Sequence, residues 1–155
     1  MARSGLGWPR VLRAIAGRRT GRLGAISLNL LLDTHAFLWW VAGDTALSST
    51  AHSAIADEGN AVFASAASAW EIATKFRIGR LPGVAAIAAD LAAILDTQGF
   101  VALPISFVHG QLAGALPGPL RDPFDRMLIA QAMHEDMVLV SNVVSFSAYG
   151  VRRLW

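Results

Sequence analysis

Four short apolar segments alternate with helix-forming segments along the chain, and this alternation limits the folds open to it. The apolar segments span residues 29–33, 61–64, 100–103 and 137–141, and we expect a short fifth one at 152–155. Apolar runs of this length are typical of strands buried on both faces. Strands separated by helices form right-handed βαβ units. The expected fold class is therefore α/β, with a mainly parallel sheet of four or five strands covered by helices on both faces.

Helix signals occupy the stretches between the apolar segments. Asp122 and Pro123 suit the N-cap and the first position of a helix, and Gly99 suits the residue that ends one. Apolar residues between 84 and 97 recur at three- and four-residue spacing, as one buried helix face requires. The expected helices span residues 34–42, 48–58, 65–78, 84–97, 106–113 and 122–135.

Length and charge restrict the class of protein. The 155 residues suit one domain, and 54% of them are hydrophobic, which is enough to fill a core. The absence of cysteine excludes disulfides and thiolate metal sites. Six arginines precede the first acidic residue, Asp33, so residues 28–155 hold seven basic and 11 acidic residues and carry a formal charge of −4. Overall basicity is therefore no argument for binding nucleic acid.

Residues 1–27 stand apart from the expected domain at 28–155. They are rich in Arg and Gly, and we expect either a disordered extension or a start codon assigned too early. The Arg18–Arg19 pair before an apolar run imitates an export signal, but no small-residue cleavage site follows it. The longest uncharged stretch, 97–120, contains three prolines and four glycines and cannot span a bilayer as a helix. We expect a cytoplasmic protein without a membrane segment.

Four acidic residues are candidates for one site. Asp33 ends the first expected strand, Glu71 lies in the helix after the second, and Asp122 and Asp125 begin the helix before the fourth. In open parallel sheets, sites form beyond the carboxyl ends of the strands. Clustered carboxylates without cysteine suit a hard cation, Mg²⁺ or Mn²⁺. Such an ion activates water and stabilises charge on a phosphoryl group.

Each of these acids also has a structural explanation. Asp33 and Asp122 are suitable helix N-caps, and an acid at Asp125 favours the helix dipole. Glu71 and Lys75 are four residues apart, as in an ordinary surface ion pair. Taken one at a time, the residues leave both readings open. The histidines are scattered, and none has a spacing that suggests a metal site: His35, His52, His109 and His134.

Read together, five segments resemble the PIN domain family, and more closely its VapC-type ribonuclease toxins from bacterial toxin–antitoxin pairs. They are LLLDTHAFLWW (30–40), SAASAWEIATKFRIGRLP (65–82), LPISFVHGQLAGALP (103–117), RDPFDRMLIAQA (121–132) and SFSAYGVRRLW (145–155). The resemblance covers about residues 29–155. It implies an α/β/α sandwich, Mg²⁺- or Mn²⁺-dependent endonucleolytic cleavage of RNA such as tRNA, and a small VapB-like antitoxin as partner. It also implies a homodimer or a toxin–antitoxin hetero-oligomer.

The resemblance assigns roles to the four acids. The family's first-strand acid corresponds to Asp33, its helix acid to Glu71, and the acid opening the later helix to Asp125, with Asp122 beside it in the DPFD motif. Many relatives have a further Asp after the fourth strand, where this chain has Val143. Valine cannot bind a metal, so the site has lost one charge. This departure puts a second metal and full activity in doubt.

Cations near the acids are the expected contacts for RNA phosphates. They are Lys75, Arg77, Arg80, Arg121 and Arg126, and solubilising surface charge explains them equally well. The leading hypothesis is a metal-dependent endoribonuclease toxin. The alternative is a catalytically weak PIN-like module that binds an antitoxin or nucleic acid. A third reading, a DNA-binding protein with a basic tail, depends only on residues 1–27.

Overall fold

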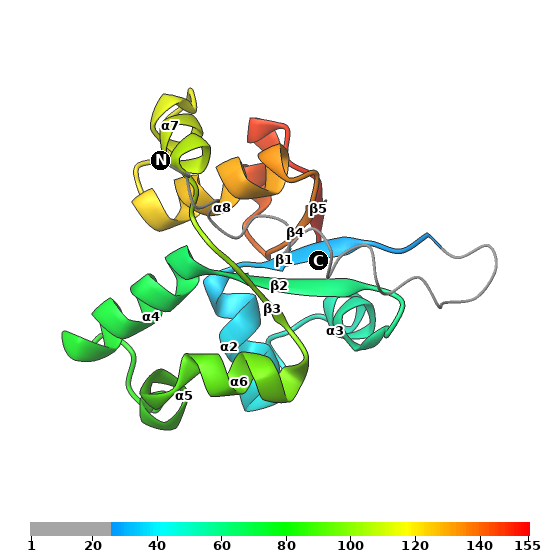
Figure 1. Cartoon of the computed structure of the whole chain (residues 1–155), viewed down its shortest axis with the longest axis vertical. Helices are drawn as coiled ribbons and strands as arrows, with labels where there is room; N and C mark the ends of the chain where they lie inside the picture. The colour runs from blue at the N-terminus through cyan, green and yellow to red at the C-terminus, as the bar shows by residue number, and fades with distance from the viewer. Residues whose placement is uncertain (1–25) are drawn as a thin grey trace, which may run out of the picture.

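A five-stranded parallel sheet forms the centre of the molecule in the computed structural model, which describes residues 26–155. The strands lie in the order β3-β2-β1-β4-β5, and every neighbouring pair is parallel (Figure 1). The expected sheet is confirmed, including the short fifth strand. The expectations for residues 1–25 lie outside the described part of the chain. The strands are β1 (Asn29–Leu32), β2 (Ala61–Ser65), β3 (Val101–Leu103), β4 (Val138–Val140) and β5 (Arg153–Leu154).

Helices cover both faces of this sheet, as an all-parallel sheet requires. One face carries α2 (Thr34–Ala42), α3 (Ser49–Ala56), α4 (Ala66–Arg77), α5 (Ala85–Ala89) and α6 (Leu91–Gln98). The other carries α7 (Phe107–Ala115), α8 (Pro123–His134) and the 3₁₀ helix η1 (Val144–Tyr149). Figure 1 shows the two layers on opposite sides of the strands. Within residues 26–155, no helix combines the length and apolarity needed to cross a membrane.

Strand β1 lies at the middle of the sheet and contributes to both cores. Leu30 and Leu32 pack in the cluster under α2, α3 and α4, while Leu31 packs in the opposite cluster with Leu128 and Ile129 of α8. None of the three β1 leucines has exposed surface. Their alternation between the two faces is the two-residue period of a strand. Burial on both faces therefore fixes the register that brings Asp33 to the carboxyl edge.

The structure differs from expectation in two places. The helix expected over residues 84–97 is interrupted at Asp90, whose side chain accepts a hydrogen bond from the Ala93 amide (3.0 Å) and caps α6. An Asp at this position competes with the helix backbone of α5 and starts a new helix instead. Helix η1 was not expected, and it places Phe146 in the core against α8.

Helix α8 is tied to the sheet and to α7 through one buried side chain. Gln131 has no exposed surface, and its Oε1 accepts from the hydroxyl of Ser65 at the end of β2 (2.6 Å). Its Nε2 donates to the carbonyl of Pro104 (3.2 Å), in the loop between β3 and α7. A buried amide needs such partners, because an unpaired one retains the full cost of leaving water. Gln131 therefore sets where α8 lies over the strands.

We predict that Gln131→Leu lowers the free energy of unfolding by about 1–3 kcal/mol, because it strands the Ser65 hydroxyl and the Pro104 carbonyl. Urea denaturation monitored by circular dichroism measures the change. Gln111→Leu is the matched control, since Gln111 is exposed on α7; its effect should stay within about 0.5 kcal/mol. Equal effects of the two substitutions would show that the Gln131 bonds contribute nothing.

Candidate acidic site at the carboxyl edge of the sheet

Asp33 lies directly after β1, at the edge where the strands end. Its amide donates to the carbonyl of Val140 on the neighbouring strand β4 (3.0 Å). Its carboxylate is buried and accepts from the amide of Ala36, which caps α2 (2.7 Å). Burial raises the pKa of Asp33 above its usual value, although bonds from Ser141 and Ala36 and the charge of His35 oppose this. Asp33 is thus both a helix cap and a desolvated carboxylate.

Glu71 lies on α4 and is almost fully buried, with both carboxylate oxygens engaged. Its Oε2 accepts from the hydroxyl of Thr34 (2.5 Å), and its Oε1 pairs with the ammonium of Lys75. Thr34 Oγ1 also lies 3.1 Å from the hydroxyl of Ser68, one turn before Glu71. A buried carboxylate held by polar neighbours differs from the exposed surface pair that the four-residue spacing alone allowed.

Asp122 and Asp125 lie at the start of α8 and differ in their roles: Asp122 caps the helix, and Asp125 is a carboxylate with a raised pKa. The Asp122 carboxylate accepts from the amides of Phe124 (2.8 Å) and Asp125 (3.1 Å), so its N-cap role is real. Asp125 is half-buried in the first turn. Burial, followed by the negative charges of Asp122, Glu71 and Asp33, raises the pKa of Asp125 to about 7. This mutual electrostatic influence joins the four predicted acids in one region.

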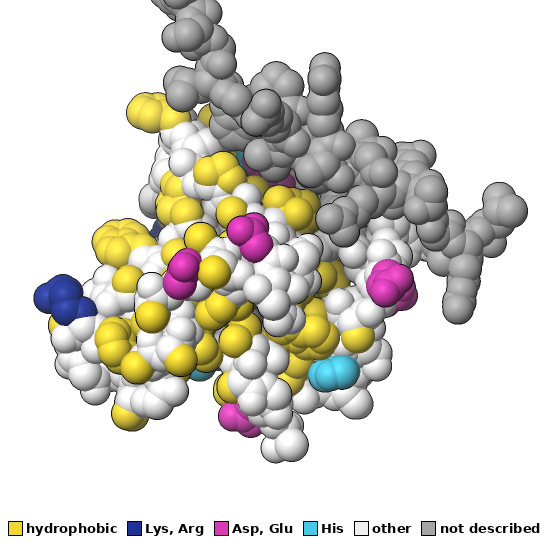
Figure 2. Space-filling model, turned by 60° about the horizontal axis from the view of Figure 1, so that its bottom comes forward, with side chains coloured by type: hydrophobic (Ala, Val, Ile, Leu, Met, Phe, Trp, Pro, Cys, Tyr) yellow, Lys and Arg dark blue, Asp and Glu magenta, His cyan; other side chains and the backbone are white. Residues whose placement is uncertain are grey.

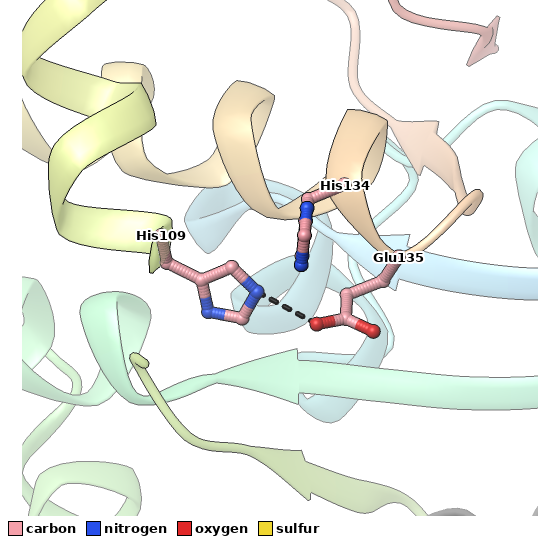
Figure 3. A group of neighbouring side chains, drawn as sticks. All are labelled: His109, His134 and Glu135. Carbon is pink, nitrogen blue, oxygen red and sulfur yellow. Dashed lines mark hydrogen bonds and ion pairs between the residues drawn. The ribbon is translucent and has the colours of Figure 1, made fainter. Parts of the chain in front are cut away.

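The four carboxylates do not close into a tight ligand shell. Among residues 26–155, only His109, His134 and Glu135 place ligand atoms from three side chains within 4.8 Å of one another. Two of the histidines that are scattered along the sequence are neighbours in space, because α7 and the end of α8 bring His109 and His134 together with ring centroids 5.4 Å apart. Figure 3 shows both beside Glu135.

The hydrogen bonds of His109 argue against a metal in this second group. Nδ1 accepts from the amide of Ser106 (3.0 Å), so the ring proton is on Nε2, where it faces Glu135 Oε1 (2.7 Å; Figure 3). Coordination through Nε2 would require loss of that proton while Nδ1 stays unprotonated. His109 has no exposed surface and completes the capping box of α7. The group is a structural link between α7 and α8.

The acidic region, by contrast, fits a divalent cation chemically. Its donors are carboxylate oxygens, which Mg²⁺ and Mn²⁺ prefer. Asp125 responds to three neighbouring negative charges, and Lys75 is the cation that counters them. A second positive charge near Asp33, Glu71 and Asp125 would relieve this repulsion. Asp122, whose Oδ1 accepts two amides, is better placed to support Asp125 than to bind an ion itself.

The predicted RNA contacts fall into two groups. Arg77, Arg80 and Arg121 are exposed, and Lys75 is partly exposed. On the face viewed in Figure 2, basic side chains lie at the margin toward the end of α4. Arg126 is different, because its guanidinium donates to four backbone carbonyls that hold the loop between α7 and α8 together. These acceptors belong to Ala113, Gly114, Leu116 and Leu120.

Val143 occupies the position where many relatives are expected to have a further Asp. Its side chain packs against the core cluster under α8. Ser141 is buried and bonds to Asp33, so a hydroxyl stands at the end of β4 beside the first acid. Asn142 is exposed. The end of β4 therefore contributes a neutral oxygen to the region and no carboxylate.

Sequence reasoning missed Thr34 and the aromatic pair beside the acids. Thr34 directly follows Asp33, and that position gave a signal once Asp33 was a candidate. Trp70 precedes Glu71 and Phe124 precedes Asp125, and their rings meet edge to face with centroids 4.9 Å apart. They line an apolar hollow of about 190 Å³ between α4, α7 and α8. Adjacency to two candidate acids was the available signal.

Comparison with known proteins identifies a family model and solved structures that are similar to this chain. A family model described as PIN domain matches residues 30–149, while no curated protein sequence matches the chain significantly. Three solved structures share the architecture at low sequence identity. VapBC2 from Rickettsia felis, bound to a DNA fragment from the promoter, aligns with a TM-score of 0.62 and 13% identity over 82% of this chain and 98% of that one.

The other two structures agree. VapC20 from Mycobacterium tuberculosis, described as a sarcin-ricin loop cleaving toxin, aligns with a TM-score of 0.58 and 19% identity over 79% of this chain and 95% of that one. FitAB bound to an IR36 DNA fragment aligns with a TM-score of 0.52 and 16% identity over 81% of this chain and 93% of that one. Identities this low establish a shared fold. Because the family model covers more than half of the sequence, the chain belongs to the PIN domain family.

Proposed function

We propose that this PIN domain is a metal-dependent endoribonuclease and the toxin of a type II toxin–antitoxin pair of the VapC type. The observation that carries the proposal is that Asp33, Glu71 and Asp125, on a PIN-family sheet, lie near enough to one another to act electrostatically on each other. The described residues contain no cysteine, and their acids are the oxygen donors suited to Mg²⁺ or Mn²⁺. Cleavage of a phosphodiester is the chemistry such a site supports.

Each residue has a distinct task in this mechanism. Asp33, Glu71 and Asp125 would hold the cation, and Asp122 would keep Asp125 in place through the first turn of α8. When bound, Mg²⁺ or Mn²⁺ activates water and stabilises the charge that develops on the phosphodiester. Thr34 and Ser141 orient Glu71 and Asp33 by hydrogen bonds. Lys75, Arg77, Arg80 and Arg121 would contact flanking phosphates; the Arg126 guanidinium already serves four carbonyls.

The proposed partners follow from the family comparison. VapBC2 and FitAB, which share the fold, are both described as bound to a DNA fragment. We propose that a small VapB-like antitoxin covers the acidic region of this chain and keeps it inactive. A homodimer, or a hetero-oligomer with the antitoxin, is the proposed assembly. RNA, with tRNA as one candidate, is the proposed substrate.

A second candidate function draws support from Val143. The end of β4 offers Ser141 and no carboxylate, and Val143 is partly buried against the core cluster. A PIN fold with one charge fewer retains the surfaces that bind an antitoxin or nucleic acid but has weaker hold on its metal. This candidate predicts binding of RNA without cleavage by a folded, antitoxin-free protein.

We predict that the purified chain cleaves RNA with Mg²⁺ or Mn²⁺, and that EDTA abolishes cleavage. Asp33→Asn and Asp125→Asn should each lower the rate about 100-fold or more, because even outer partners of metal ligands contribute 10–100-fold. Gel analysis of a panel of structured RNAs, with rates at saturating metal, provides the measurement.

Asp96→Asn is the matched control, because Asp96 is an exposed acid on α6. It should cleave as the unmodified chain does. Cleavage that persists in Asp33→Asn and Asp125→Asn would point to a contaminating nuclease and remove the support for this site. RNA binding without any cleavage would favour the second candidate.

We also predict a pH dependence of stability in the metal-free protein. The folded-state pKa of Asp125, about 7, exceeds its ordinary value of 3.8. The folded state therefore binds the proton more tightly than the unfolded chain, and the stability that this proton contributes is lost as pH rises through about 7. The Tm measured in EDTA should fall between pH 6 and pH 8. Asp125→Asn should show a smaller fall, and an identical fall in both proteins would contradict the assignment.

A further inference from the structure

The pairing of Lys75 with Glu71 has a consequence for the proposed metal site. Three ion pairs occur within residues 26–155, and this is the one that involves a candidate acid. The ammonium of Lys75 contacts Glu71 Oε1, while Thr34 holds Oε2. Lys75 also acts electrostatically on Asp125, where its charge lowers the pKa. One lysine is thus the counter-ion of the acidic region.

The two sides of this contact differ in freedom. The Glu71 side chain is 4% exposed and lies on the buried face of α4, so its carboxylate has little room to move. The Lys75 side chain is 30% exposed, and its ammonium ends a flexible four-carbon stem. When the two separate, Lys75 is the partner that moves. It lies on α4 four residues after Glu71, on the same side of the helix.

We infer that Lys75 is a tethered counter-ion that neutralises Glu71 in the metal-free protein and must leave Oε1 before Glu71 can bind a divalent cation. The inference rests on the proposed function, since it assumes that Glu71 is a ligand. The ammonium and the cation compete for the same carboxylate oxygen and repel each other. Lys75 therefore lowers metal affinity, and it limits binding of stray cations when substrate is absent.

The released ammonium then has a second partner. It remains attached to α4 beside the acids, where the phosphate groups of a bound RNA would lie. Pairing with a phosphate recovers the electrostatic energy that Lys75 loses on leaving Glu71. Metal binding and RNA binding thereby favour each other. Metal binding at Glu71 releases the Lys75 ammonium for a phosphate, and RNA binding draws the ammonium away and frees Glu71 for the metal. Lys75 is a positioning residue for Glu71 and a contact for RNA.

Mn²⁺ titration of the full chain by calorimetry, after removal of bound ions, tests this inference. Lys75→Met should bind Mn²⁺ about three- to tenfold more tightly, because a competing charge a few ångströms away is gone. Arg152→Met is the control: it also removes one positive charge, but from an exposed ion pair with Asp136, and Arg152 precedes β5, at the edge of the sheet opposite the acids. Its Mn²⁺ affinity should change less than twofold. Thermal melts confirm that both variants fold.

The RNA readout separates competition from a purely structural role. At saturating Mn²⁺, Lys75→Met should bind RNA more weakly and with a salt slope smaller by about one, as loss of a phosphate contact predicts. Lys75→Arg, which keeps the charge, should restore both the weak Mn²⁺ affinity and the RNA affinity. A structural defect would not tighten metal binding.

Each outcome decides something. Unchanged or weaker Mn²⁺ binding by Lys75→Met overturns the inference, and if the unmodified chain still cleaves RNA with metal, the proposed function stands without it. Tighter binding in the absence of any cleavage supports the inference and contradicts the nuclease. Failure of both proteins to bind Mn²⁺ contradicts both. Mn²⁺ binding by Lys75→Met alone supports Lys75 as the group that occupies the site.

Discussion

The central strand β1 is buried on both faces, and this burial fixes the position of Asp33, which follows it. Leu30, Leu31 and Leu32 fill two cores at once, so a shift of one residue would exchange the faces and disrupt both. With this register fixed, Asp33 emerges between α2 and the end of β4. Helices α4 and α8 then bring Glu71 and Asp125 to the same edge. The site is a consequence of how the sheet is packed.

Concentrating acids at a partly buried edge of the sheet is electrostatically unfavourable, and hydrogen bonds and one ion pair partly offset this cost. Ser141 and the Ala36 amide bond to Asp33, while Thr34 and Lys75 engage Glu71. Burial, followed by the charges of the neighbouring acids, still raises the pKa of Asp125 to about 7. A divalent cation is the natural completion of such a set. Lys75 would link metal binding to RNA binding, since its ammonium, once it leaves Glu71, becomes available to a phosphate.

Local signals in the sequence predicted most of the fold and supplied the acids of the proposed site. Strand position and helix order followed from apolar runs and from Asp-Pro at the start of α8, because these features act over a few residues. Features created by contacts between distant segments were out of reach. His109 and His134 meet only after α7 packs on α8, and the four carbonyls that take up Arg126 converge only in the folded loop. Asp90 interrupts a helix that periodicity alone extends.

Anomalous diffraction from crystals soaked in Mn²⁺ would locate the bound ion without reference to activity. We expect one strong peak among the carboxylates of Asp33, Glu71 and Asp125, with the Lys75 ammonium displaced from Glu71. A peak beside His109, His134 and Glu135, or none at the carboxyl edge of the sheet at saturating Mn²⁺, would contradict this expectation.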